Sequence, residues 1–269
     1  GRIDVSVHPF CGGGHPTDVR ITTRYRTNNF FESLFAVIHE SGHGLYEQGR
    51  MEGFLDLPVS EPLTMGIHES QSLFWERMIG QGKNFCVLYY DKFVEIFPHA
   101  FSGVTVENLY NAINICQPSF IRVEADEVTY PIHIIIRYEI EKDLFDGSIK
   151  VKDLPEVWSD KMEEYLEIRP SSDSQGVLQD VHWSGGAFGY FPSYTLGAMY
   201  ACQFYNQMII DLKDVPALID RGDFKIIKAW LNENIHRQGR LFSSDKLALK
   251  VTGEPLNPNI FINYLKNKY

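Results

Sequence analysis

The spacing of apolar and polar positions predicts a mainly helical chain. Between positions 30 and 48, apolar side chains recur at the period of one helix face, at Phe31, Leu34, Phe35, Ile38 and Leu45. Asn29 can cap this helix, with Glu32 three residues later as in a capping box. We expect the helix to end near Gln48, with Gly49 as the residue beyond its end.

Similar patterns predict further helices along the rest of the chain. A helix over 60–78 would carry Pro62 in its first turn, where proline is tolerated. The later helices are expected over 84–97, 105–116, 118–144, 155–167, 193–211, 214–221, 223–238, 243–252 and 257–267.

Two segments depart from the helical pattern. Clustered β-branched residues predict a short strand from Val19 to Tyr25, preceded by a loop over 10–16 that contains three consecutive glycines. Glycines and aromatic residues interrupt the segment 176–192, for which we expect loop and hairpin structure. Since no shift in composition marks a boundary, we predict one catalytic domain over 1–269. Its fold class is mainly α, with a small β-sheet or hairpin.

Charge and cysteine content narrow the classes of partner and compartment. The 269 residues carry a formal net charge of -10 without a dense run of Lys or Arg, so nucleic acid and anionic membrane surfaces are not expected partners. No apolar run reaches the roughly 18 residues of a membrane span. Four cysteines far apart, without a CxxC pair, predict free thiols in a reducing compartment, hence a cytoplasmic location; they are Cys11, Cys86, Cys116 and Cys202.

The sharpest chemical signal is the segment His39-Glu40-Ser41-Gly42-His43. Histidines four residues apart share one face of a helix, so both imidazoles can reach one cation, with Glu40 beside it. This pattern predicts a zinc site with an open position for water, and Glu40 as the base that activates the water. The alternative, two unrelated histidines on a surface helix, is disfavoured by the apolar residues of 35–38. Gly42 suggests close approach by another group, such as a substrate backbone.

A catalytic zinc site needs a third protein ligand, which spacing alone leaves open. Glu69 lies in the middle of the expected second helix, and Glu61 and Glu76 lie near its two ends. Glu47 shares the face of the two histidines but lies beyond them, so we expect a solvated carboxylate at the helix end. A metal-bound histidine usually donates its other N–H to an acceptor, which in some zinc peptidases is an Asp four residues after the Glu ligand. Here that position is Leu73, so the acceptor must come from elsewhere, and Asp126 is one candidate.

Six segments, in order, resemble the M32 metallocarboxypeptidases, a group related to the oligopeptidase and angiotensin-converting-enzyme clans. They are His8-Pro9-Phe10, the segment 18–22 (DVRIT), the segment 39–43 (HESGH), the segment 68–71 (HESQ), the segment 121–126 (IRVEAD) and the segment 176–183 (GVLQDVHW). The resemblance covers essentially the whole chain. It implies that Glu69 is the third metal ligand, in a mostly helical fold with a small sheet beside a deep active-site groove.

The resemblance also implies an activity and an organisation. Members of this family remove single residues from peptide C-termini with a zinc ion, which a site of two His and one Glu can exchange for Co²⁺ or Mn²⁺. A homodimer is expected on the same ground. Because family members are longer, we expect this chain to be the C-terminal catalytic half of such a protein, beginning inside it. The likeness of 261–269 to the family's end predicts an intact C-terminus.

Further site residues follow by analogy with the related clans. There, a His and a Tyr stabilise the oxyanion, which points to His182 and Tyr190 here, with Tyr194 as a substitute; the alternative is aromatic packing around a turn. A carboxypeptidase also needs an anchor for the substrate's terminal carboxylate, typically a bidentate arginine. Arg122 and Arg20 are candidates, and Arg24 is a third.

Each substrate-binding candidate has a structural alternative. Arg122 can instead pair with Glu124 or Asp126, and Arg20 with Asp18. His8 either lines the substrate groove or is a loop residue. The leading hypothesis is therefore a zinc carboxypeptidase acting on peptides with a free C-terminus. The alternatives are an endo-acting oligopeptidase with the same metal chemistry, and a metal-binding fragment without turnover.

Overall fold

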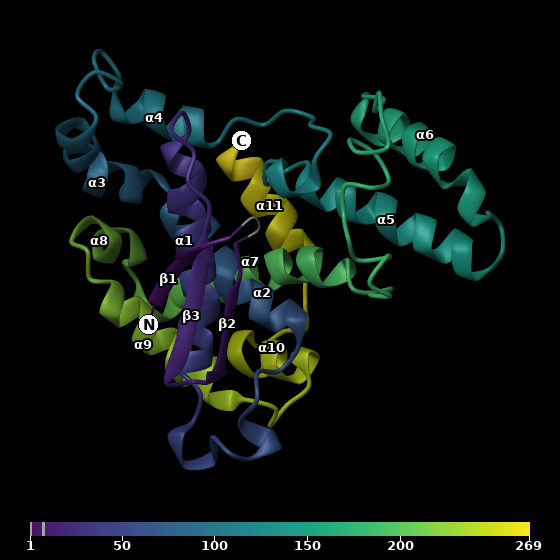
Figure 1. Ribbon diagram of the computed structural model, residues 1–269. Helices are drawn as coiled ribbons and strands as arrows, with labels where there is room; N and C mark the ends of the chain where they lie inside the picture. Colours follow the sequence, from purple (N-terminus) through teal and green to yellow (C-terminus); the bar gives the residue numbers. More distant parts are fainter. Residues whose placement is uncertain (1, 7–8) are drawn as a thin grey trace. The chain divides into compact units, whose positions relative to one another are not determined.

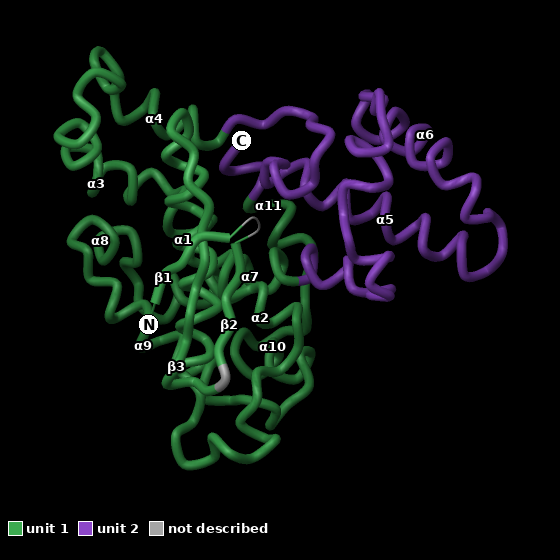
Figure 2. The backbone as a smooth tube through the Cα atoms, viewed as in Figure 1, with its two compact units in different colours: residues 1–114, 197–264 green, residues 115–196, 265–269 purple. Residues whose placement is uncertain are grey.

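The structure is a computed structural model that describes residues 2–6 and 9–269 (Figure 1). The chain divides into two compact units (Figure 2). Unit 1 comprises residues 1–114 and 197–264, and unit 2 comprises 115–196 and 265–269. Helices dominate both units, and a three-stranded sheet lies in unit 1, which confirms the predicted fold class. The expectation of a single catalytic domain stays a prediction.

The sheet is built from the first described residues of the chain. β1 (Arg2–Val5) pairs in parallel with β3 (Asp18–Thr23), and β2 (Cys11–His15) pairs with β3 in the antiparallel direction. β3 thus confirms the predicted strand, although it ends two residues before Tyr25.

The expected glycine loop over 10–16 is wrong, because β2 contains all three glycines. The pairing of β2 with β3 is irregular between Gly12 and His15. A Cβ atom on Gly13 would lie 2.0 Å from the carbonyl oxygen of Asp18. Glycine therefore lets the two backbones approach each other at the bulge, instead of ending the strand.

α1 (Phe30–Gln48) is capped as predicted, since Oδ1 of Asn29 accepts a hydrogen bond from the backbone N–H of Glu32 at 3.2 Å. The Glu32 carboxylate pairs with Arg24 and Arg26. Gly49 does follow the helix, but its backbone is right-handed (φ −84°). Close packing requires glycine at this position, because a Cβ atom on residue 49 would lie 2.5 Å from Nδ1 of His236.

The second predicted helix begins later than expected. α2 (Met65–Leu73) is capped by Thr64 and continues directly into a π-helical segment, η3 (Phe74–Gly80). Pro62 precedes the helix, because residues before Thr64 form two short 3₁₀ turns, η1 (Glu52–Phe54) and η2 (Pro58–Ser60), and an extended connection.

The backbones of α1 and α2 touch at Gly42. A Cβ on this residue would lie 2.5 Å from the carbonyl oxygen of Gln71 and 2.6 Å from Cα of Ser72. The expectation of a substrate backbone at Gly42 is therefore wrong; α2 occupies that space.

The remaining helices of unit 1 agree with the predicted ones within a few residues. They are α3 (Lys83–Ile96), α4 (Val106–Ile113), α8 (Val215–Asp220), α9 (Phe224–Asn234), α10 (Ser244–Thr252), and the parts of α7 (Pro192–Leu212) and α11 (Pro258–Lys268) that belong to this unit. The helix predicted over 223–238 ends at Asn234, and a separate 3₁₀ turn, η6 (His236–Gln238), follows it. None of the four cysteines, all of which are described, forms a disulfide, in agreement with the predicted thiols. Among the described helices, none has both the length and the apolar character needed to cross a membrane.

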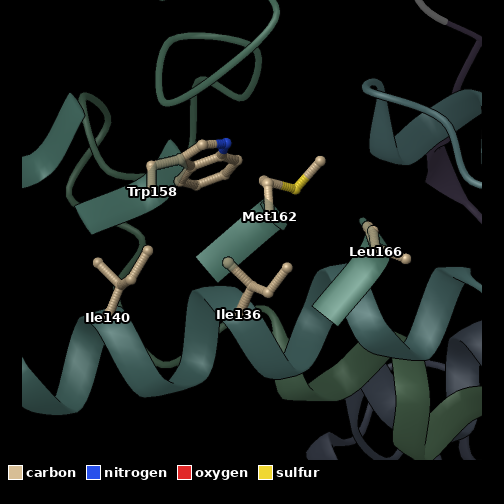
Figure 3. Packing of buried hydrophobic residues seen from close by; sticks show 5 residues of the cluster. All are labelled: Ile136, Ile140, Trp158, Met162 and Leu166. Atoms are coloured by element: carbon tan, nitrogen blue, oxygen red, sulfur yellow. The ribbon is translucent and has the colours of Figure 1, made fainter. Parts of the chain in front are cut away.

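Unit 2 is organised around two helices, α5 (Tyr130–Phe145) and α6 (Leu154–Leu166), with the short turns η4 (Arg122–Glu124) and η5 (Val151–Asp153). Figure 3 shows the core between them, formed by Ile136, Ile140, Trp158, Met162 and Leu166. The helix predicted from 118 begins only at Tyr130. Just before the helix, the Asp126 carboxylate accepts hydrogen bonds from the backbone N–H groups of residues 128 and 129 and folds a turn.

The expected hairpin over 176–192 is wrong, whereas the expected loop is confirmed. This segment consists of successive turns and contains no strand. Gly186 (φ 77°) and Gly189 (φ 73°) adopt the left-handed conformation that turns require and other residues avoid.

Candidate metal centre

Three potential metal ligands converge between α1 and α2 in unit 1. Nε2 of His39 lies 3.8 Å from Oε2 of Glu69, and Nε2 of His43 lies 3.4 Å from the same oxygen. All three donor atoms lie within 4.8 Å of one another. Donors bound tetrahedrally to one zinc ion at about 2.0–2.1 Å lie roughly 3.3 Å apart. The residues therefore fit a single metal ion with little adjustment.

Two glycines let the surrounding helices approach this group. Gly42, between the two histidines on α1, admits the backbone of α2. Gly197 on α7 packs directly on Glu69, since a Cβ there would lie 2.7 Å from Cβ of the glutamate. The close packing leaves Glu69 buried next to both imidazoles.

Of the carboxylates that spacing left open, Glu69 is the one that lies near Nε2 of both histidines. Glu61 is half-buried and pairs with Arg240 at 2.7 Å. Glu76 binds the other side of the His39 ring, where its Oε2 accepts a hydrogen bond from Nδ1 at 2.8 Å. Sequence reasoning considered Glu76 only as a possible metal ligand. Its position about two helical turns after Glu69 could have indicated that it accepts a hydrogen bond from a ligand histidine instead.

His43 has a different partner, which sequence reasoning missed. Its Nδ1 lies 2.6 Å from Nδ1 of His68 and 3.1 Å from the carbonyl oxygen of the same residue. Nε2 of His68 lies 3.1 Å from Oε1 of Glu47. The expectation of a solvated Glu47 is therefore wrong. Since Nδ1 of each histidine is occupied, Nε2 is the atom left for a metal.

The other candidate acceptor, Asp126, binds its own unit. Besides the two backbone groups before α5, its carboxylate accepts hydrogen bonds from Thr129 Oγ1 at 2.8 Å and from the backbone of Gln117 at 3.1 Å. Leu73, at the position where some zinc peptidases carry an Asp, is buried in the core.

Burial and charge set the protonation of the centre. Burial acts to lower the pKa of His39, but Glu69 and the hydrogen bond with Glu76 raise it to about 9. Burial lowers the pKa of His43 to about 4. For Glu69, burial acts to raise the pKa, yet the two histidines bring it to about 2. In the metal-free chain His39 therefore carries an extra proton at neutral pH, which Nε2 must lose before it can bind a divalent cation beside the ionised Glu69 carboxylate.

Glu40 lies between the two histidines in sequence and is buried. Burial raises the pKa of its carboxyl group to about 7. A carboxyl group that titrates near neutral pH can both accept and return a proton under physiological conditions.

Four other predicted site residues come together in unit 2. Nε2 of His182 lies 3.0 Å from the hydroxyl of Tyr194, and the His182 ring lies 5.4 Å from that of Tyr190. The Arg122 guanidinium lies over the Tyr194 ring, 4.7 Å from its centroid. The described contacts thus unite His182 and Tyr190 of the segment 176–192, and Tyr194 at the start of α7, with the arginine of the IRVEAD segment.

Arg122 is buried, and its ionic partner is neither Glu124 nor Asp126, which corrects the structural alternative. Its Nη2 lies 2.7 Å from Oδ1 of Asp180, and its Nη1 donates to the hydroxyl of Tyr130 at 2.9 Å. Arg137 shares the same aspartate at 2.6 Å. Sequence reasoning missed Arg137 and Asp180, although a charged residue in the apolar run of α5 signals a buried ion pair.

The remaining substrate-binding candidates lie elsewhere. Arg20 is exposed on β3 and pairs with Asp18 at 2.7 Å, as its structural alternative predicted. Arg24 pairs with Glu32. His8 lies outside the described residues.

A model of the protein family described as Carboxypeptidase Taq (M32) metallopeptidase matches residues 1–269. Carboxypeptidase 1 of Bacillus subtilis (strain 168) is 49% identical over 269 residues, which are 100% of this chain and 54% of the relative. Thermostable carboxypeptidase 1 of Pyrococcus furiosus is 44% identical over 268 residues, which are 100% of this chain and 54% of the relative. A solved M32 carboxypeptidase from Deinococcus radiodurans R1 matches with a TM-score of 0.97 and 38% identity, over 100% of this chain and 54% of that chain. The chain therefore spans about half the length of the relatives it matches.

Proposed function

Since the chain belongs to the Carboxypeptidase Taq (M32) metallopeptidase family, we propose that it carries the catalytic centre of a metal-dependent carboxypeptidase. The reaction is hydrolysis of the last peptide bond of a peptide with a free C-terminus. The observation that carries this proposal is the convergence of Nε2 of His39, Nε2 of His43 and a carboxylate oxygen of Glu69 within 4.8 Å.

His39, His43 and Glu69 would hold one divalent ion, for which zinc is the first choice and Co²⁺ or Mn²⁺ can substitute. When bound, such an ion supplies Lewis acidity and makes a nucleophilic water available near neutral pH. The Glu40 carboxylate would accept a proton from the attacking water as the water oxygen bonds to the peptide carbonyl carbon. Glu40 then returns the proton to the leaving nitrogen when the C–N bond breaks.

The remaining roles in this proposal belong to residues that the sequence motifs singled out. His182 and Tyr190, with Tyr194 as the substitute for Tyr190, donate hydrogen bonds to the oxyanion. Arg122 is the proposed partner of the substrate's terminal carboxylate and would exchange part of its ionic contact with Asp180 for this carboxylate. Arg20, His8 and Tyr194 are proposed as further substrate contacts. A homodimer and a cytoplasmic location stay predictions of the family resemblance and the cysteine content.

The test is a peptidase assay on the zinc-loaded chain with one short peptide, prepared with a free or an amidated C-terminus. We expect mass spectrometry to detect stepwise loss of C-terminal residues from the free peptide only, and no loss with Glu40→Gln. Internal cleavage of both peptides would identify an endo-acting oligopeptidase. Bound zinc without release from either peptide would contradict activity of this chain and indicate a metal-binding fragment.

A further inference from the structure

We propose that His68 is a positioning residue for the metal centre, and that it holds the His43 ring in the tautomer and orientation that present Nε2 to the metal. The inference rests on the proposed metal site and adds the device that orients one of its ligands. His68 immediately precedes the ligand Glu69, so one segment of α2 would supply a ligand and the support of another ligand.

The hydrogen-bond geometry dictates where the protons lie. A histidine that binds a metal through Nε2 carries its proton on Nδ1, which must then donate. The nearest acceptor is Nδ1 of His68 at 2.6 Å, closer than the carbonyl oxygen of the same residue at 3.1 Å. Nδ1 of His68 therefore offers its lone pair, and the proton of this neutral ring lies on Nε2. Glu47 accepts that proton's hydrogen bond at 3.1 Å.

The Glu47 end of this chain of hydrogen bonds is held by Arg50, which binds the backbone before α2. Oε2 of Glu47 accepts a hydrogen bond from Nη1 of Arg50 at 3.2 Å, and Nε of Arg50 donates to the carbonyl oxygen of Ser60 at 2.7 Å. The buried ring of Tyr46 packs against the His68 ring at 5.1 Å, with the planes 67° apart. A ring held at both nitrogens and on one face has little freedom to rotate.

The two metal-ligand histidines are thus oriented by different chemistry. Nδ1 of His39 donates directly to the carboxylate of Glu76. For His43, an imidazole stands between the ligand and the carboxylate of Glu47. Acceptors of this kind commonly contribute about 10–100-fold to metal affinity.

Two substitutions of His68 separate positioning from packing. The side-chain oxygen of Asn takes the place of Nδ1 and can still accept from His43, whereas the amide nitrogen of Gln takes the place of Nε2 and can still donate to Glu47. Zinc affinity is measured by calorimetric titration of the full chain, with thermal unfolding of the metal-free proteins to confirm folding. We expect His68→Gln to weaken zinc binding about 10–100-fold and His68→Asn to weaken it much less.

A third variant, Glu47→Leu, leaves His68 in place and removes the acceptor of its Nε2–H together with the contact to Arg50, so it is expected to weaken zinc binding as well. Equal affinities of wild type, His68→Gln and Glu47→Leu would overturn the proposal, because His43 would then rely on the backbone carbonyl. A larger loss with Asn than with Gln would also overturn it, because packing volume would then decide. A wild-type chain that binds no zinc would overturn the metal site itself.

Discussion

Glu76 accepts a hydrogen bond from Nδ1 of His39 at 2.8 Å, while its other carboxylate oxygen accepts one from Nε2 of Gln81 at 3.2 Å. The glutamate comes from the π-helical segment η3, which continues directly from the helix that carries Glu69. One continuous stretch of helix thus places a carboxylate on each side of the His39 ring.

Removing this acceptor should weaken metal binding. We expect Glu76→Leu to lower zinc affinity about 10–100-fold, because Nδ1 of His39 loses its hydrogen-bond partner and the ring can turn. Glu61→Leu is the matched control, since it removes a carboxylate that pairs with Arg240 outside the centre. Calorimetric titration with zinc measures both, and equal loss in the two variants would contradict the positioning of His39 by Glu76.

Gly42→Ala tests the contact between α1 and α2. Alanine favours an isolated helix by about 1 kcal/mol over glycine. Here its Cβ would lie 2.5 Å from the Gln71 carbonyl oxygen, so the helices must separate. We expect a net destabilisation of roughly 1–3 kcal/mol and weaker zinc binding, measured by thermal unfolding and titration. Gly53→Ala is the control: open space surrounds its Cβ position, so neither the stability nor the zinc affinity should change. A Gly42→Ala protein more stable than the wild type would refute the tight contact.

These two relationships mark where sequence reasoning reached its limit. The period of apolar positions located α1, and the spacing of its histidines located a metal site, because both depend on neighbours within one helix. Which element meets Gly42, and which carboxylate meets His39, depends on how helices pack. Helix spacing therefore left Glu61, Glu69 and Glu76 as equal candidates, and only the family resemblance favoured Glu69.

Asp180 is the shared counter-ion of two buried guanidinium groups, those of Arg122 and Arg137. Burial acts to raise the pKa of Asp180, but the two arginines lower it to about 2, so the carboxylate is ionised. We expect Asp180→Asn to destabilise unit 2 by roughly 3–5 kcal/mol, because two buried cations lose their counter-ion. Chemical unfolding followed by tryptophan fluorescence measures this. Asp173→Asn changes an exposed carboxylate nearby and should have little effect; equal losses would contradict the buried pairing.

His133 should make the stability of unit 2 depend on pH. Burial, and then the charges of Arg137 and Arg122, lower its pKa from 6.5 to about 4, although Asp180 acts in the opposite direction. Between these values the unfolded chain binds a proton that the folded chain refuses. The stability contribution is therefore present above pH 6.5 and is lost as the pH falls through about 4, amounting to roughly 3 kcal/mol.

The measurement is the free energy of unfolding of wild type and His133→Phe between pH 7 and 4. Phenylalanine fills a similar volume without a titrating group, so the variant should lose stability less steeply than wild type over this range. Parallel pH profiles of the two proteins would rule out a contribution from His133.

The ion network of unit 2 also shows why part of the candidate site escaped sequence reasoning. Arg122 was singled out by its motif, but the expected partners were its sequence neighbours Glu124 and Asp126. The true partner, Asp180, is 58 residues away in a segment of irregular turns. Such turns have no periodicity from which a contact can be inferred, so only the fold identifies the pair.

The proposed activity depends most directly on whether His39, His43 and Glu69 bind one metal ion. Calorimetric titration of the metal-free chain with zinc, beside the variants His39→Asn and Glu69→Gln, tests this. We predict one zinc ion per wild-type chain, a much weaker or absent binding in both variants, and thermal stabilisation of the wild type only. Equal zinc binding by the wild type and both variants, or no binding by a folded wild type, would contradict it.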